Sequence, residues 1–253
     1  MNRLFKLSQL SAFGLSIGLA SLALAPAIVS AAAPTTNPFC TNLSATVSRV
    51  NSNISNLENK MTTARSQQDQ KLSANWAKWD QQIQANRAKW DGLRQADFAK
   101  LQAKAKTSTQ QAAVQTYITA VLNAVSTRRA ANDAARATYR SAVQTVIASQ
   151  RTNIDSQVST FTNAVNAAES TAQASCQATP SAGATIRVSF QTSMNNARQS
   201  FISDRKSDGT IGNQIKQLAQ TRNASFKANN DAFLAAIKAA ATVLKTAFGN
   251  QNI

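Results

Sequence analysis

Apolar residues in the first part of the chain recur at alternating steps of three and four positions. The series consists of Cys40, Leu43, Val47, Val50, Ile54, Leu57, Met61 and Ala64. A heptad pattern of this kind places the apolar side chains along one side of a helix and is typical of helices that pack in coiled coils. We therefore expect a long helical arm over about 41–106.

An 11-residue repeat follows the heptads within the same arm. The segments 75–85 (NWAKWDQQIQA) and 86–96 (NRAKWDGLRQA) share Asn, Ala, Lys, Trp, Asp, Gln and Ala at equivalent positions. Eleven residues in three turns correspond to about 3.67 residues per turn, so the helix continues nearly straight. We expect Trp79 and Trp90 to lie on one line in the core and to face the alanine-rich segment 130–137.

A second apolar stripe begins after a short polar interruption and extends to Cys176. Thr107, Ser108 and Thr109 in this interruption are residue types that cap helix N-termini. The sequence therefore predicts a second helical arm over about 109–176.

The two cysteines of the chain suggest how these arms are arranged. Cys40 and Cys176 are the only cysteines, and Ser108 lies midway between them. If the chain folds back near Ser108, the two sulfur atoms meet at the open end of an antiparallel hairpin. The sequence thus predicts a disulfide-closed hairpin over 34–178, with residue i of the first arm opposite about residue 216 − i of the second.

A third amphipathic stripe covers 184–248, after a linker at 179–183 that contains Pro and Gly. Its length matches that of each earlier arm, which favours an elongated three-helix bundle in which a third long helix packs on the hairpin. Residues that break or kink helices also occur inside this arm: Ser207, Asp208, Gly209 and Gly212. They can divide the arm into two helices, and 249–253 is expected to be a tail.

The composition agrees with an all-α fold. Hydrophobic residues make up 43% of the chain, and there are only 7 glycines and 4 prolines. Good helix formers with few breakers favour helices, and no convincing alternating β pattern is present.

The N-terminal segment has the features of an export signal. Arg3 and Lys6 precede an apolar stretch over 10–24, and the small residues at 29–33 offer a cleavage site. We expect 1–33 to be a signal peptide and the protein to be extracellular, at the cell surface or periplasmic, where paired thiols oxidise. The alternative is an uncleaved anchor, since about 20 apolar residues can span a bilayer. No span is expected in the mature chain.

The net charge of +16 arises from 27 Lys and Arg against only 11 Asp and Glu. Excess positive charge favours polyanionic partners, such as anionic envelope polymers, anionic membrane or nucleic acid. The alternative is that the charge only keeps a helical protein soluble.

Catalytic chemistry is poorly supported by the residue types present. The chain has no histidine, which is the commonest general base and a frequent zinc ligand. Asp69, Asp80 and Asp91 recur every 11 residues, so neighbours stand about 16 Å apart along a helix and cannot form an acid–base pair. We expect no catalytic residue, cofactor or metal site, and a structural role for both cysteines.

One cluster of basic and aromatic residues is a candidate contact for polyanions or glycans. The predicted hairpin brings these residues close together: Trp76, Arg87, Lys89, Arg94, Arg128, Arg129, Arg136 and Arg140, with Tyr139 beside them. Guanidinium and aromatic groups can bind phosphates, bases or sugars by charge and stacking. In the alternative interpretation the aromatic rings flank the seam, the arginines form a solvated face, and Arg129 pairs with Asp133 one turn later.

Several local motifs stand out: NPFCTNL after the export signal, the AKWD repeats, and DRK, QTRNASFK and LKTAF near the end. These motifs resemble those of a type of secreted long-helix protein of reduced-genome bacteria that has no assigned activity. The resemblance covers most of the mature chain and implies an exported helical protein. The chain is also similar, more loosely, to basic periplasmic holdase chaperones with helical tentacles, whose β-rich trimerisation body has no counterpart here.

Together these features favour a secreted or envelope-associated, non-enzymatic helical protein. It would act as a structural spacer, an adhesin or a binder of anionic surface polymer. Two alternatives stay open at this point, a periplasmic or extracellular holdase-type chaperone and an exported nucleic-acid-binding protein.

Overall fold

The structure is a computed structural model that describes residues 38–207 and 211–249. The expected signal peptide over 1–33 lies outside the described residues, as do positions 250–253 of the expected tail. Within the described ranges the chain is helical almost throughout and contains no strand. The all-α fold class is therefore confirmed.

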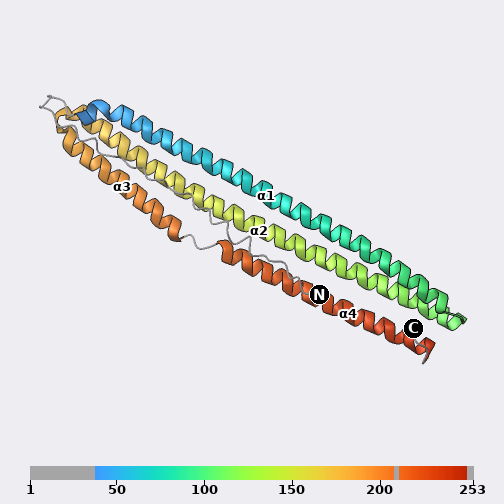
Figure 1. The fold of residues 1–253 in the computed structure, drawn as a ribbon. Coiled ribbons are helices and arrows are strands. Elements are labelled where there is room, and N and C mark those ends of the chain that lie inside the picture. Colours follow the sequence, from blue (N-terminus) through green and yellow to red (C-terminus); the bar gives the residue numbers. More distant parts are fainter. Residues whose placement is uncertain (1–37, 208–210, 250–253) are drawn as a thin grey trace. The chain divides into compact units, whose positions relative to one another are not determined.

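The helices follow one another as α1 (Pro38–Lys104), α2 (Ser108–Ala178), the short 3₁₀ helix η2 (Pro180–Ala182), α3 (Gly183–Ser207) and α4 (Ile211–Phe248) (Figure 1). The first two helices occupy the two arms expected from the sequence. The third arm consists of two helices rather than one. Positions 208–210, between these two helices, lie outside the described residues.

A capping box sets the start of α2 after a tight connection from α1. The backbone N–H of Gln110 donates to Oγ1 of Thr107 at 3.2 Å, and the N–H of Thr107 donates to Oε1 of Gln110 at 3.2 Å. The N–H of Lys106 donates to the same Oε1 at 2.9 Å. These reciprocal bonds satisfy donors that a helix N-terminus leaves without partners, so they favour chain reversal at this point.

The chain divides into two compact units that cut across both arms. Unit 1 comprises Met1–Asp69 and Ile147–Gly212, and unit 2 comprises Gln70–Val146 and Asn213–Ile253. Among the described residues, unit 1 therefore contains the first part of α1, the last part of α2 and α3. Unit 2 contains the rest of α1 and α2 together with most of α4.

Unit 1 is closed by the disulfide between Cys40 and Cys176, whose Cα atoms lie 5.5 Å apart. This bond confirms the cysteine pairing expected from the sequence. The core beside it combines residues of all three helices: Leu43, Val50, Ile54, Val165, Ala168, Ala172, Ile186, Phe190 and Met194. The small side chains of Ala168 and Ala172 on α2 oppose larger ones on α1 and α3, a complementarity that close packing requires.

Unit 2 has a core that depends on α2 and α4. One cluster combines Ala105, Val114, Leu244 and Phe248, with Leu101 and Tyr117 packed against it. The helix α1 contributes less here, because its four buried residues, Leu43, Val50, Ile54 and Met61, all belong to unit 1. In unit 1 the third helical segment packs on both hairpin helices, and in unit 2 it packs on α2, which confirms the expected bundle arrangement.

The expectation that Trp90 is a core residue is wrong. Its side chain is 55% exposed, whereas Trp79 is half-buried. In this part of α1 the partly buried positions include Ile83, Arg87, Asp91 and Arg94, which follow helical spacing. The face of α1 that packs against its neighbours therefore includes charged residues here. Trp90, 11 positions after Trp79, does not lie on this face.

Candidate functional site

The eight residues predicted to contact polyanions all lie in unit 2. Trp76, Arg87, Lys89 and Arg94 belong to α1, and the four other arginines belong to α2. The fold therefore brings both halves of the predicted cluster into one unit. These side chains are available to a ligand only where they are not already held by contacts within unit 2.

Five of the six arginines in the cluster form ion pairs with aspartates of the same unit. Arg129 binds Asp91 through two bonds, with Nη2–Oδ1 and Nη1–Oδ2 distances of 2.7 and 2.9 Å. Arg94 reaches the same carboxylate from one turn away on α1. Arg140 binds Asp80 in the same bidentate manner, again at 2.7 and 2.9 Å.

The remaining two paired arginines share Asp133 of α2. Nη2 of Arg87 donates to Oδ1 of Asp133 at 2.7 Å, and Arg136 contacts the same oxygen atom. The pair expected between Arg129 and Asp133 is absent from the described contacts, because Arg129 turns to α1 instead. A partner on the facing helix has replaced the partner one turn along the same helix.

The pKa values of these carboxyl groups reflect their arginine neighbours. Hydrogen bonds from Arg129 and Arg94 lower the pKa of Asp91 to about 2. The hydrogen bond from Arg140 lowers the pKa of Asp80. Burial by itself would raise the pKa of Asp133, but the hydrogen bonds from Arg87 and Arg136 outweigh it and the net shift is downward. At neutral pH these carboxylates are ionised and hold their arginines.

Aromatic rings hold arginines as well. The guanidinium carbon of Arg128 lies 3.8 Å from the centre of the Phe233 ring of α4, and Nη1 of Arg128 donates to Asn230 at 3.4 Å. Arg222 of α4 stacks on Tyr139 of α2 at 4.5 Å. Cation–π contacts of this geometry favour the packing of α4 on α2, because the cation faces the negative side of the ring.

Trp76 is also engaged, since Arg140 lies over its ring at 5.4 Å. Of the eight predicted contact residues, Lys89 is the one left exposed without an ion pair or ring contact among the residues that the structure describes. The cluster is thus brought together as expected, but its arginines and Trp76 contact partners inside unit 2.

The exposed lysines are the feature that sequence reasoning missed. Ten lysines are exposed and have no ion pair within 38–207 and 211–249: Lys60, Lys71, Lys78, Lys89, Lys104, Lys106, Lys206, Lys216, Lys238 and Lys245. By contrast, seven of the aspartates that the structure describes form ion pairs, five of them with arginine alone.

A signal for this division was present in the sequence. Arg129, Arg140 and Arg151 recur every 11 residues in α2, in step with the aspartate repeat of α1. The structure pairs them in antiparallel order: Asp69 with Arg151, Asp80 with Arg140, and Asp91 with Arg129. Matching periods of opposite charge on two antiparallel helices predict such pairs.

No group of three or more His, Cys, Asp or Glu residues that could hold a metal ion occurs in the described part of the chain. None of its helices has the length and apolar character needed to cross a membrane. Comparison with known proteins gives no relative, since no family model, curated protein or solved structure matches the chain.

Proposed function

We propose that this chain is an exported, non-enzymatic helical protein that binds anionic polymers of the cell envelope through its exposed lysines. The observation that carries the proposal is the separation of roles between its two cationic residue types. Arginines pair with aspartates between the helices, whereas ten exposed lysines lack such partners in the described ranges.

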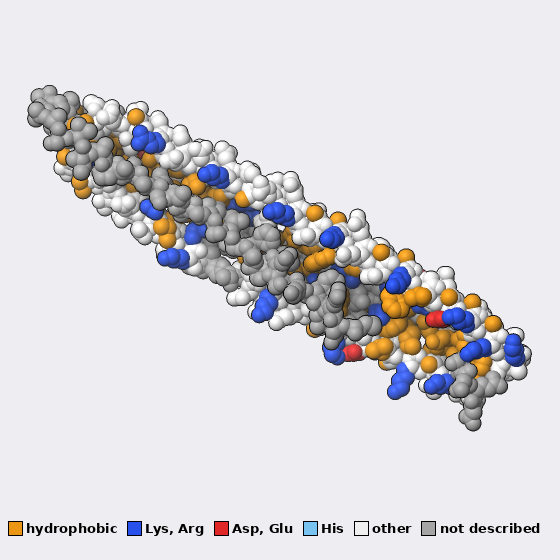
Figure 2. Space-filling view, in the orientation of Figure 1, with side chains coloured by type: hydrophobic (Ala, Val, Ile, Leu, Met, Phe, Trp, Pro, Cys, Tyr) orange, Lys and Arg blue, Asp and Glu red, His pale blue; other side chains and the backbone are white. Residues whose placement is uncertain are grey.

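Lysine suits this role because its ammonium group is a compact, strongly hydrated charge on a flexible stem. Such groups attract polyanions by charge alone, without a shaped site. On the face seen in Figure 2, Lys and Arg side chains are spread out rather than gathered, and few Asp or Glu side chains accompany them. A distributed charge of this kind favours an extended polymer over a small anion.

Export is supported by two independent features. Residues 1–33 have the composition of a signal peptide, and the Cys40–Cys176 disulfide is a bond that persists in oxidising compartments. An exported helical protein with excess positive charge meets anionic polymers first at the envelope. A role as spacer or adhesin follows if the bound polymer anchors the helices there.

A binding experiment with matched lysine variants tests the proposal. Fluorescence anisotropy with labelled inorganic polyphosphate would compare the natural protein with a variant in which Lys71, Lys78, Lys89 and Lys104 of α1 become Gln. We expect affinity to fall at least tenfold, with a shallower dependence on salt because fewer counterions are released. A variant with the same four positions changed to Arg keeps the charge and should bind like the natural protein.

Two results would overturn this function. One is the absence of polyphosphate binding at low salt, and the other is binding that the Gln variant leaves unchanged. Competition with double-stranded DNA separates the nucleic-acid alternative. If DNA displaces polyphosphate at a hundredfold lower charge concentration than the envelope fraction of the source, nucleic acid is the preferred partner.

A holdase-type chaperone is the second candidate, because exposed apolar side chains are concentrated in unit 2. Of the six large hydrophobic residues that are exposed in the described part of the chain, Val188 belongs to unit 1 and the others to unit 2: Trp90, Leu93, Leu122, Leu234 and Val243. If they bind unfolded clients, changing Trp90 and Leu234 to Gln should abolish suppression of client aggregation. Val188→Gln is the matched control and should have no effect.

A further inference from the structure

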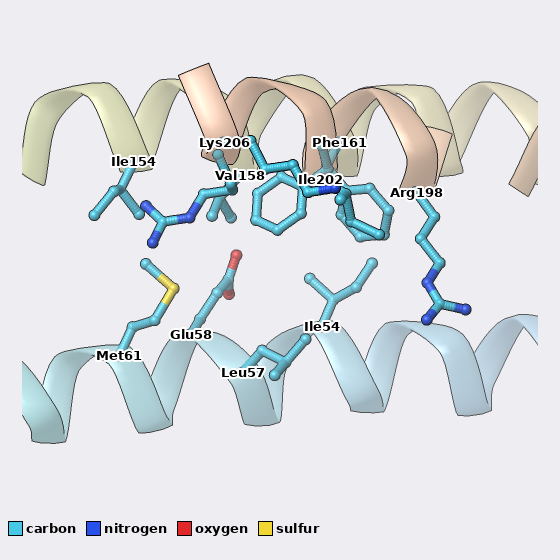
Figure 3. Close-up of a pocket in the computed structure, with 12 residues that line it drawn as sticks. Ile54, Leu57, Glu58, Met61, Ile154, Val158, Phe161, Arg198, Ile202 and Lys206 are labelled. Atoms are coloured by element: carbon cyan, nitrogen blue, oxygen red, sulfur yellow. The ribbon is translucent and has the colours of Figure 1, made fainter. Parts of the chain in front are cut away.

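Unit 1 contains an apolar cavity of about 250 Å³ between α1, α2 and α3 (Figure 3). Its apolar walls are provided by Ile54, Leu57 and Met61 of α1, by Val158 and Phe161 of α2, and by Ile202 of α3. Every lining residue belongs to unit 1, so the cavity is a property of this unit alone.

The walls are held by the packed core. Ile54, Met61 and Ile154 are buried, with exposed fractions of 7, 8 and 5%. The rings of Phe161 and Phe201 pack with their centres 5.5 Å apart. The apolar part of this lining offers few polar partners to water, which needs two to four of them, and is well suited to a hydrocarbon chain.

Charged residues surround this apolar interior. Three cations, Arg198, Arg205 and Lys206, come from the last turns of α3, and one carboxylate, Glu58, comes from α1. Figure 3 shows Arg198 at one end of the cavity and the Glu58 side chain directed into it. Arg198 and Lys206 have no ion pair within the described ranges, so the lining has an excess of positive charge.

The volume limits the size of a ligand. Drug-sized ligands occupy pockets of about 300–1,000 Å³, so a cavity of about 250 Å³ accommodates a smaller or thinner molecule. One acyl chain of medium length meets this limit, whereas the two chains of a phospholipid exceed it. The apolar walls bind the chain, and the cations of α3 attract a negative head group.

We propose that this cavity binds a single-chain amphiphile with an anionic head group, such as a medium-chain carboxylate. Arg198 and Lys206 are the head-group contacts, and Glu58 opposes binding by repulsion. The proposal does not rest on polymer binding by the lysines, because the four lysines altered in that test belong to unit 2. The two proposals can therefore fail separately.

Titration calorimetry of the disulfide-bonded protein with sodium decanoate, below its micelle concentration, tests the site. We expect one equivalent to bind, and decyltrimethylammonium to bind at least tenfold more weakly. Arg198→Gln and Lys206→Gln should each weaken decanoate binding at least threefold, whereas Glu58→Gln should strengthen it. Lys60→Gln removes an exposed lysine of the same unit that does not line the cavity, and it should leave decanoate binding unchanged.

Val158→Trp fills the cavity and should abolish binding, provided that circular dichroism shows an unchanged helix content. The charge variants keep the test valid if that variant does not fold, because Glu58 and Lys206 are exposed. Absence of decanoate binding, tighter binding of the cationic amphiphile, or weaker binding by Glu58→Gln would each overturn the proposal.

Discussion

Asp80 of α1 and Arg140 of α2 form a bidentate ion pair with N–O distances of 2.7 and 2.9 Å. In this pair, residue i of α1 contacts residue 220 − i of α2. The same numbering rule describes the pairs Arg65–Asp155 and Asp69–Arg151 in unit 1. It also describes Arg87–Asp133 and Asp91–Arg129 in unit 2. The disulfide follows 216 − i, the rule predicted from the sequence.

The direction of helical side chains explains the difference of four residues. Each Cα–Cβ bond tilts towards the N-terminus of its own helix. In an antiparallel pair, long side chains therefore meet when their Cα atoms are displaced in opposite directions along the two axes. Four residues correspond to about 6 Å along the helix axis. The long side chain of an arginine can bridge this offset to an aspartate, whereas the short side chains of two cysteines cannot bridge it.

These pairs also exclude alternative registers of the hairpin. A slip of 11 residues would leave two of the three Asp–Arg pairs of the repeat in place. The same slip in one direction places Arg65 opposite Asn166 and Arg87 opposite Gln144, neither of which carries a charge. The two pairs in which α1 supplies the arginine and α2 the aspartate therefore specify the register, which the 11-residue repeat by itself leaves ambiguous.

Charge reversal tests this register. Asp80→Arg alone should lower the midpoint of urea unfolding, because it places two guanidinium groups together. Combining it with Arg140→Asp should restore most of the stability, with a coupling free energy of about 0.5–1 kcal/mol, as for exposed pairs. Reversal of Lys227 and Asp231, a pair within α4, serves as the control. Failure of the double variant to recover would show that the pair does not contribute to register.

Removal of the disulfide should destabilise the protein strongly. The cysteines are separated by 136 positions, and the chain-entropy model gives about 4–5 kcal/mol for a loop of this size. Thermal unfolding of the Cys40→Ser, Cys176→Ser double variant measures the loss. Hydrogen exchange should increase most in the segments of unit 1 next to these positions. An unchanged melting temperature would contradict the prediction.

Glu169 of α2 should make the protein less stable at neutral pH than in mild acid. Its side chain is buried, Asn51 donates to Oε2 at 3.4 Å, and Oε1 has no hydrogen-bond partner among the described residues. Burial raises the pKa of this carboxyl group above its usual 4.5. Stability from this group is thus fully present below pH 4.5 and decreases as pH rises through the higher folded-state pKa.

The variant Glu169→Gln removes this titration. At pH 7 we expect its free energy of unfolding to rise by about 1 kcal/mol, because an ionised group no longer lies buried with an unpaired oxygen. Urea unfolding at pH 4 and pH 7 provides the measurement. A variant that is less stable than the natural protein at pH 7 would show that the carboxylate has a favourable partner.

Asp91 should behave in the opposite way in acid. Its pKa of about 2 lies below the usual 3.8, mainly through the hydrogen bond from Arg129 and next through that from Arg94. The stability that it contributes is present above pH 3.8 and is lost as pH falls towards 2. Carbon-13 NMR titration of the carboxyl group gives its pKa, and Arg129→Gln should move it upward. Asp69, whose pKa is lowered by the hydrogen bond from Arg151 instead, is the control and should not respond to this variant.

Much of the fold was accessible from the sequence because helical periodicity is a local property. The spacing of Leu43, Val50 and Ile54 identified a buried stripe, and all three are buried in unit 1. The position of Ser108 midway between Cys40 and Cys176 was sufficient to predict the chain reversal and the disulfide. Each of these inferences depends either on the periodicity within one helix or on a disulfide for which the chain offers a single pair of cysteines.

The partners of the charged residues and the cavity depended on tertiary structure. Periodicity shows which residues share a face of one helix, but it does not fix the rotation of that face towards its neighbours. A rotation of this kind exposes Trp90, places Arg87 and Asp91 in the seam, and directs Arg129 to Asp91 instead of Asp133. The sequence determined the helices, the reversal and the disulfide, whereas packing between helices decided which charges are neutralised and where an apolar space remains.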